Sequence, residues 1–441
     1  MRVAVVVLVG GWGIGGAWTR PARAQPLATA ETGTDAKTDA KTEAKTDARS
    51  DADAKTDARS DAPPDTPTEP SWLDGDHATG DWGGARTDLA NRGVQLDVVY
   101  ASDLFTARGE TAALGHVDAA LTLDSHKLGL WDGGTLYALG QNNHGSGIND
   151  QVGSAQPVTN LEAQPYTQLT ELFYEQALFE QKLRIRIGKQ DGNREFGTPR
   201  FGGNFINNNF GMFPNAPIPS YPTTGLGAFA AVQPAAWLTG KAAIFEGSPE
   251  VGGFGLGNAF RDGAGYLVVG SAAVTHHEGA DARDGGTTSA GAWRQTGEFP
   301  ELGVAAPGTF DSNAGFFVQH DERIYLHPED ANDPRGLTVI LRLGWARADR
   351  SAIDRYAGGS AAWHGIGARS NDTVGIGGGT FTVAEPAGVA MARSRESFLE
   401  AFYKARFTSF ASVQPDVQWF QHPGGHGANA LVAGLRFKVK L

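Results

Sequence analysis

The sequence contains no cysteine, which excludes disulfide bonds and thiolate metal sites. A chain without thiols is also suited to crossing an oxidising periplasm in an unfolded state. The formal net charge of −12 leaves no basic excess. This balance argues against a nucleic-acid partner, because phosphate recognition needs a basic face. The basic residues that are present must therefore act locally.

Long apolar runs are also missing from the chain after its N-terminal segment. A membrane-spanning helix needs roughly 20 consecutive, mostly apolar residues, and no later segment reaches that length. A helical membrane protein is therefore excluded. If the chain crosses a bilayer, it must do so with strands that satisfy one another's backbone groups.

The N-terminus has the three parts of a secretory signal. Arg2 is a minimal charged region, residues 3–14 form an apolar core, and Ala22-Arg23-Ala24 fits the small-x-small cleavage pattern. We predict a signal peptide at residues 1–24 and a mature chain that begins near Gln25. An uncleaved anchor helix is the alternative, but it would need a longer apolar stretch.

Residues 25–70 form a low-complexity segment. Between residues 31 and 69 a four-residue unit such as Thr34-Asp35-Ala36-Lys37 repeats, and a proline-rich stretch follows. Large apolar side chains are almost absent, so the segment cannot bury enough surface to offset its ordering entropy. We predict a disordered periplasmic spacer or tether. A coiled coil is excluded because there is no apolar seam.

From Trp72 onward, short runs of alternating apolar and polar residues are separated by turn-forming residues. In residues 431–441 the odd-numbered positions are apolar, while Arg436, Lys438 and Lys440 lie at even-numbered ones. A period of two indicates a β-strand with one apolar face. The same pattern occurs in four further segments, at residues 94–100, 183–187, 337–345 and 399–407.

Alternation alone is also found in soluble β-sandwiches, so length and context must decide. Strands of about ten residues, an export signal, and aromatic residues at strand ends (Tyr100, Trp345 and Phe407) are typical of outer-membrane barrels. Residues 71–441 have room for about 16 such strands. We predict an all-β chain that forms a transmembrane antiparallel up-and-down β-barrel around an aqueous channel.

Four blocks of residues carry a family resemblance. They are Trp72-Leu73 with residues 80–94, residues 171–191, residues 205–222 and residues 414–436. In this order they resemble the carbohydrate-selective porins of the OprB type. The resemblance covers the chain from Trp72 to its last residue, although Leu441 stands where such barrels usually have Phe.

The resemblance implies a sixteen-stranded outer-membrane barrel that passes mono- and small oligosaccharides by passive diffusion. It also implies a constriction lined by Arg and Glu. The expected partners are carbohydrates, outer-membrane lipid and the barrel assembly machinery, in a monomer or a homotrimer. No cofactor is expected.

A sugar-selective pore needs hydrogen-bonding groups that face water at its narrowest part. By pleat parity the candidates that point into the lumen are Arg184, Arg186, Arg342, Glu171, Glu175 and Asp97. The residues favoured for the constriction are Arg184 and Arg186 beside Glu171 and Glu175. The alternative is that all six solvate the lumen and brace its wall through cross-strand ion pairs.

Residues 202–210 are rich in Asn and Phe and contain too many turn formers for a strand. They predict a long loop, which could fold inward and narrow the pore. Its amides, with Asn207 as a candidate, and its aromatic residues suit sugar recognition. Alternatively, the Asn residues set turn geometry and the aromatic residues pack the loop.

No pattern supports catalysis or metal binding. His276 and His277 have no carboxylate at a spacing that would complete a metal site. Residues 375–379 lack the Lys-Ser/Thr that ends a phosphate-binding loop. We therefore expect no enzyme. The remaining alternatives are a porin for other solutes and a secreted all-β glycan-binding protein or glycosidase.

Overall fold

The computed structural model describes residues 72–251, 263–276, 285–304, 307–326, 335–384 and 393–441. The predicted signal peptide (1–24) and the predicted spacer (25–70) lie outside these residues, as does His277.

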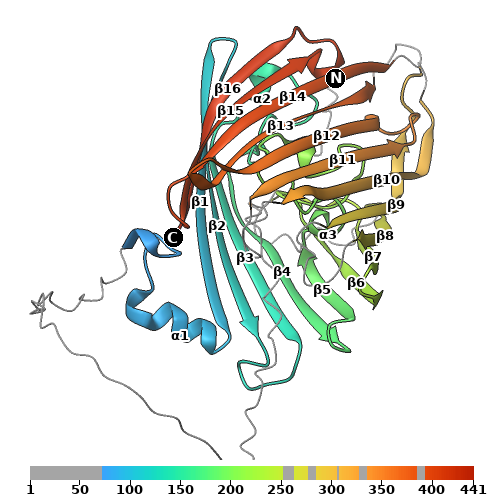
Figure 1. Cartoon of the computed structure of the whole chain (residues 1–441). Helices are drawn as coiled ribbons and strands as arrows, with labels where there is room; N and C mark the ends of the chain where they lie inside the picture. Colours follow the sequence, from blue (N-terminus) through green and yellow to red (C-terminus); the bar gives the residue numbers. More distant parts are fainter. Residues whose placement is uncertain (1–71, 252–262, 277–284, 305–306, 327–334, 385–392) are drawn as a thin grey trace, which may run out of the picture. The chain divides into compact units, whose positions relative to one another are not determined.

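Sixteen antiparallel strands form a closed barrel, which confirms the predicted fold class (Figure 1). Each strand pairs with its neighbours in the sequence, and the first strand pairs with the last, so that no sheet edge is left open. The strands are β1 (Val94–Ala107), β2 (Glu110–Asp124), β3 (Gly134–Gly145), β4 (Tyr166–Leu178), β5 (Leu183–Gln190), β6 (Gly225–Ala235), β7 (Leu238–Glu246), β8 (Tyr266–His276), β9 (Gly286–Pro300), β10 (Thr309–Leu326), β11 (Gly336–Ala346), β12 (Ile353–Ile366), β13 (Arg369–Ala384), β14 (Arg393–Arg406), β15 (Ala411–Gln421) and β16 (Ala430–Lys440).

The helical elements are short. They are η1 (Trp72–Asp74), η2 (Trp82–Gly84), α1 (Ala85–Asn91), α2 (Asn149–Val152), α3 (Asn193–Phe196), η3 (Asn208–Phe210) and η5 (Pro423–Gly425). Within the described residues, none of the helices has the length and apolar character needed to cross a membrane.

The strands turn their apolar face outward. On β11 the exposed side chains include Leu341, Leu343 and Trp345, whereas Ile340 and Arg342, at the alternate positions, are buried. The apolar residues of β16 are exposed in the same alternating way. An apolar band on the outside of a closed barrel suits lipid and not water. The parity predicted from the sequence is thus confirmed on these strands.

The barrel is closed where β1 meets β16, and an ion pair reinforces this seam. Asp103 and Arg436 are register partners across the seam. Arg436 donates from Nε to Asp103 Oδ1 at 2.6 Å and from a terminal guanidinium nitrogen to Oδ2 at 2.7 Å. A bidentate pair fixes both distance and register between the first and last strands.

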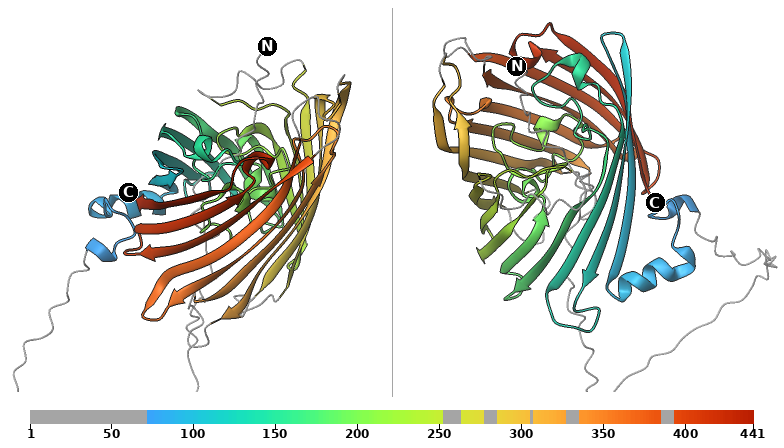
Figure 2. Two further views of the ribbon diagram at one scale, coloured as in Figure 1. Left: turned by 90° about the horizontal axis from the view of Figure 1, so that it is seen from above. Right: turned by 180° about the vertical axis from the view of Figure 1, so that it is seen from behind.

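The longest connection, residues 191–224 between β5 and β6, folds into the barrel; we call it the lumenal loop. The connections drawn in green lie inside the ring of strands (Figure 2). The loop reaches the far wall, where the backbone amides of Ile206 and Asn207 donate to the two carboxyl oxygens of Glu400 on β14, at 2.7 and 2.9 Å. The predicted long loop at residues 202–210 is therefore present and folded inward.

Aromatic contacts and Arg342 hold the lumenal loop along the wall. Three phenylalanines of the loop pack against rings on β10 and β14, with ring centroids 4.9 to 5.5 Å apart. On β11, Arg342 donates to the backbone oxygens of Asn209 (2.9 Å) and Gly197 (2.6 Å) and lies over the ring of Phe213. The loop thus spans the lumen between β5 and β14.

Candidate pore constriction

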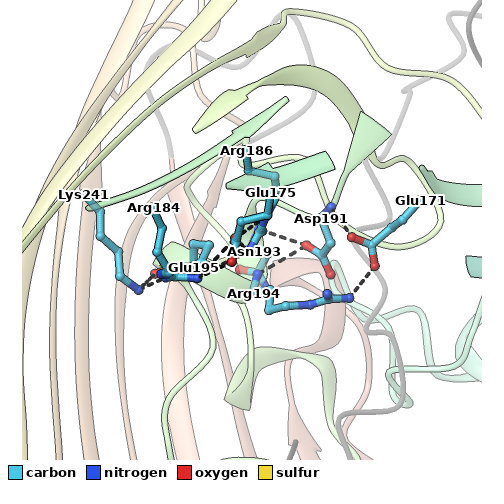
Figure 3. A network of polar contacts seen from close by, with 9 residues as sticks. All are labelled: Glu171, Glu175, Arg184, Arg186, Asp191, Asn193, Arg194, Glu195 and Lys241. Atoms are coloured by element: carbon cyan, nitrogen blue, oxygen red, sulfur yellow. Dashed lines mark hydrogen bonds and ion pairs between the residues drawn. The ribbon is translucent and has the colours of Figure 1, made fainter. Parts of the chain in front are cut away.

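Charged side chains from three strands and the lumenal loop meet on one side of the lumen. Figure 3 shows this group, which we call the charge cluster. Its members are Glu171 and Glu175 on β4, Arg184 and Arg186 on β5, Lys241 on β7, and Asp191, Asn193, Arg194 and Glu195 in the loop.

Arg186 lies at the centre of the cluster. It donates to Glu175 Oε2 from Nε (2.9 Å) and from a terminal nitrogen (2.7 Å), and the same terminal nitrogen donates to Glu195 Oε1 at 2.9 Å. Its guanidinium also lies over Phe173 and Phe229, 4.5 and 5.2 Å from the ring centroids. The other terminal nitrogen, NH1, is buried and has no hydrogen-bond partner among the described residues. NH1 is therefore one of several buried polar atoms without a partner among the described residues.

Arg184 and Lys241 form the more accessible edge of the cluster. Their side chains are 30% and 23% exposed, whereas that of Arg186 is 6% exposed. Arg184 contacts Glu175 at 3.3 Å and Glu195 at 3.4 Å, and Lys241 Nζ lies 3.0 Å from Glu195 Oε2. Charges of both signs therefore face the remaining space of the lumen.

The loop carboxylate Glu195 is surrounded by cations. Burial alone would raise the pKa of Glu195, but the positive charges of Lys241, Arg186 and Arg184 hold that pKa well below its usual range. The surrounding cations thus favour the charged form of Glu195, which ties the start of the lumenal loop to β5 and β7.

The second half of the cluster shapes the first turn of the loop. Glu171 is buried, forms an ion pair with Arg194, and accepts a hydrogen bond from the Asp191 backbone amide at 3.0 Å. Asp191 Oδ1 in turn accepts from the Asn193 amide at 2.9 Å. Burial and the neighbouring charge of Glu171 raise the pKa of Asp191 above its usual range. Glu171 thus acts on the loop and is shielded from the open lumen.

Among the described residues, no group of three or more His, Asp or Glu side chains is placed to hold a metal ion.

The comparisons with known proteins agree with one another. A family model described as "Carbohydrate-selective porin, OprB family" matches residues 108–441. The chain belongs to this family. The barrel is an outer-membrane carbohydrate porin, and its family and fold imply a channel and not an enzyme.

Two solved structures share the fold. The high-pH structure of Pseudomonas putida OprB is 19% identical, with a TM-score of 0.74, and the match covers 84% of this chain and 100% of that chain. The low-pH structure of the same protein is 18% identical, with a TM-score of 0.55, and the match covers 84% of this chain and 99% of that one. No curated protein sequence matches this chain.

The porin brings together four of the residues that the sequence suggested for the constriction. Arg184, Arg186, Glu171 and Glu175 all lie in the charge cluster. Part of their contacts are cross-strand ion pairs, which was the alternative role for these residues. Glu175 and Arg186, for example, are register partners on β4 and β5. Arg184 is paired with Glu175 and Glu195 as well, but its side chain remains 30% exposed.

Three other candidates lie elsewhere. Arg342 is 1% exposed and lies behind the lumenal loop, where it holds loop carbonyls. Asn207 is buried in the loop and donates from its amide to Gln418 at 2.9 Å. Asp97 points inward near the end of β1 and pairs with Lys440 at 3.1 Å. None of the three contacts the charge cluster. The alternating pattern predicts which face of a strand a side chain occupies, but not how far along the barrel axis that side chain lies.

Several members of the cluster were missed by the sequence reasoning. Lys241 lies on β7, whose sequence shows no strict alternation of apolar and polar residues, and the charged residues after β5 belong to the loop. The run Asp191-Gly192-Asn193-Arg194-Glu195 is the signal that could have revealed them, since dense charge directly after an inward-facing Arg pair is unusual for an exposed turn.

The phenylalanines of the loop are packing residues. Phe205, Phe210 and Phe213 are almost fully buried and contact wall aromatics. Asn207 sets local geometry, because its Oδ1 accepts from the Asn209 amide at 3.0 Å. Of the two readings of this segment, the contacts favour turn geometry and packing over direct sugar recognition.

A second connection, residues 146–165, also folds inward and carries a titratable group. Glu162 Oε1 accepts from the Asn149 amide at 2.7 Å, and its Oε2 is buried without a partner among the described residues. Burial, with the nearby charges of Asp150 and Asp103, raises the pKa of Glu162 to about 7.

This raised pKa predicts a pH dependence of stability. The folded porin keeps the Glu162 proton above the ordinary pKa of 4.5, so the stability that the proton provides is lost as the pH rises through about 7. Glu162→Gln cannot ionise and should be more heat-resistant than wild type at pH 8, with a smaller difference at pH 5. The measurement is the temperature at which half of the folded barrel, seen as a separate band on a gel, is lost. An equal difference between Glu162→Gln and wild type at both pH values would contradict the prediction.

Proposed function

We propose that sugars cross the porin beside the lumenal loop, with the exposed edge of the charge cluster as their hydrogen-bonding surface. The observation that carries this proposal is the accessible edge of the cluster, where the side chain of Arg184 is 30% exposed and that of its partner Glu175 is 18% exposed.

The chemistry of the cluster suits polyhydroxylated solutes. A sugar hydroxyl is both a donor and an acceptor, so it can donate to the partly exposed carboxylate of Glu175 while it accepts from Arg184. Because the acids and bases already neutralise one another, entry of a neutral sugar leaves no uncompensated charge. Each contact is short-lived, which is what passive diffusion without cofactor or energy coupling requires.

The remaining parts of the chain complete this proposal. Residues 1–24 would direct export and be removed, residues 25–70 would form a periplasmic spacer, and residues 71–441 would form the porin domain. The outward apolar band would contact outer-membrane lipid after insertion by the barrel assembly machinery. The functional unit would be a monomer or a homotrimer.

The double substitution Arg184→Ala/Arg186→Ala tests the site. We expect it to weaken the block of single-channel current by glucose by roughly tenfold, because a hydrogen bond from a charged group contributes about 1.5–3 kcal/mol. Planar-bilayer conductance of the purified porin, titrated with glucose and with a larger sugar, measures the block.

Arg355→Ala is the matched control. Arg355 lies on β12 with a side chain that is 73% exposed and at the opposite parity to the inward-facing Tyr356. It should leave the glucose block unchanged. Wild-type channels that are indifferent to both sugars would overturn the proposed sugar contacts and favour a pore for other solutes.

A further inference from the structure

A second group of charged side chains faces the lumen from β14 and β16. Lys404 and Arg406 share the inward parity of Glu400 on β14, and Lys438 shares that of Arg436 on β16. These strands are separated by β15 alone (Figure 1). We call Lys404, Arg406 and Lys438 the basic row.

None of the three side chains of the basic row forms an ion pair with a carboxylate among the described residues, unlike their neighbours at the seam. Arg436 and Lys440, on the same strand as Lys438, are paired with Asp103 and Asp97. Lys404, in contrast, donates only to the side-chain oxygen of Asn204, at 3.1 Å.

The side chains of Arg406 and Lys438 also have no carboxylate partner among the described residues. Arg406 donates from its guanidinium to the backbone oxygen of Ser409 at 3.1 Å. Lys438 makes no hydrogen bond or ion pair among the described residues.

One carboxylate faces Lys438 from β2, which is separated from β16 by β1 alone, and it is already engaged. Asp118 on β2 accepts from the Gln141 amide at 2.6 Å and lies 3.1 Å from the imidazole of His116. The other charged groups that face the Lys438 ammonium are Lys404, Arg406 and Arg436. Neighbouring cations that lack an ion-pair partner favour the binding of an anion.

Small residues lie beside the members of the row. Ser412 on β15 is the register partner of both Arg406 and Lys438, and Ala101 on β1 is the partner of Lys438 on its other side. The two long cations therefore flank a short hydroxyl side chain and can converge on one group above it. An amide is also at hand, because Asn204 of the lumenal loop contacts Lys404.

We propose that the basic row binds the carboxylate of a sugar acid, such as an aldonate or a uronate, as a second lumenal site across from the charge cluster. This inference rests on the proposed function, since the hydroxyls of the same solute would use the charge cluster. Lys438 and Arg406 hold the carboxylate from two sides, and Lys404 adds charge and positions the loop amide. The porin thereby admits acidic sugars alongside neutral ones.

Single-channel block by gluconate, glucose and inorganic phosphate tests this site on wild type and on Lys438→Gln. We expect gluconate to block wild type about five-fold more strongly than glucose, because one close ion pair in water contributes about 1 kcal/mol. Lys438→Gln should remove most of that excess and leave the glucose block unchanged. Lys438→Arg should restore it.

Lys440→Gln is the matched control, because it removes the same charge from the same strand at a position paired with Asp97. It should preserve the gluconate excess. Equal block by gluconate and glucose in wild type, or an excess that survives Lys438→Gln, would overturn the second site while the glucose block still supports the proposed function. Phosphate block as strong as gluconate block would overturn the assignment to sugar acids.

Discussion

Arg342→Met is expected to raise the single-channel conductance and to make the open current unsteady. The wild-type side chain donates two hydrogen bonds to carbonyls of the lumenal loop and supports the ring of Phe213. Each such charge-assisted bond contributes about 1.5–3 kcal/mol. Methionine fills much of the same volume but donates nothing. The loop should then leave the wall for part of the time, and the lumen should widen whenever it does.

Recordings of current noise and mean conductance in planar bilayers measure this effect. Arg347→Met is the control, because Arg347 follows β11 in an exposed connection and its side chain makes no hydrogen bond among the described residues. Its current should match wild type. A steady channel of unchanged conductance in Arg342→Met would show that the aromatic contacts hold the loop without the arginine.

Asp103→Ala is expected to lower the thermal stability of the barrel strongly. Asp103 neutralises Arg436 across the seam between β1 and β16 and also accepts a hydrogen bond from Thr159 of an inward connection. Its loss leaves a largely buried guanidinium without its carboxylate. Breaking a buried pair on one side costs about 3–5 kcal/mol, so the folded band on a gel should disappear at a clearly lower temperature.

A double substitution separates charge from packing at the seam. Asp103→Ala/Arg436→Met removes both charges and should recover much of the lost stability, because replacing a whole buried pair by apolar groups is often close to neutral. Equal heat resistance of Asp103→Ala and wild type would contradict the role of the pair. Equal loss in the single and double variants would assign the effect to packing alone.

The sequence by itself determined the faces of the strands. Side chains alternate with a period of two in every strand, so Leu341 and Arg342 must point in opposite directions whatever the rest of the chain does. With an export signal and no long apolar run, that local rule was sufficient to predict a barrel with its apolar side outward. The length of residues 71–441 had room for about 16 strands. The family resemblance implied the same strand number and added the sugar.

The tertiary structure alone decided which inward residues meet. Glu195 joins Arg186 because the lumenal loop turns back over β5, and Ile206 meets Glu400 because the same loop crosses to the far wall. Arg342 has the predicted parity but lies under that loop. Closure around the barrel also determines which cations find a carboxylate and which, like Lys438, do not. These contacts join positions far apart in the chain, and local periodicity carries no information about them.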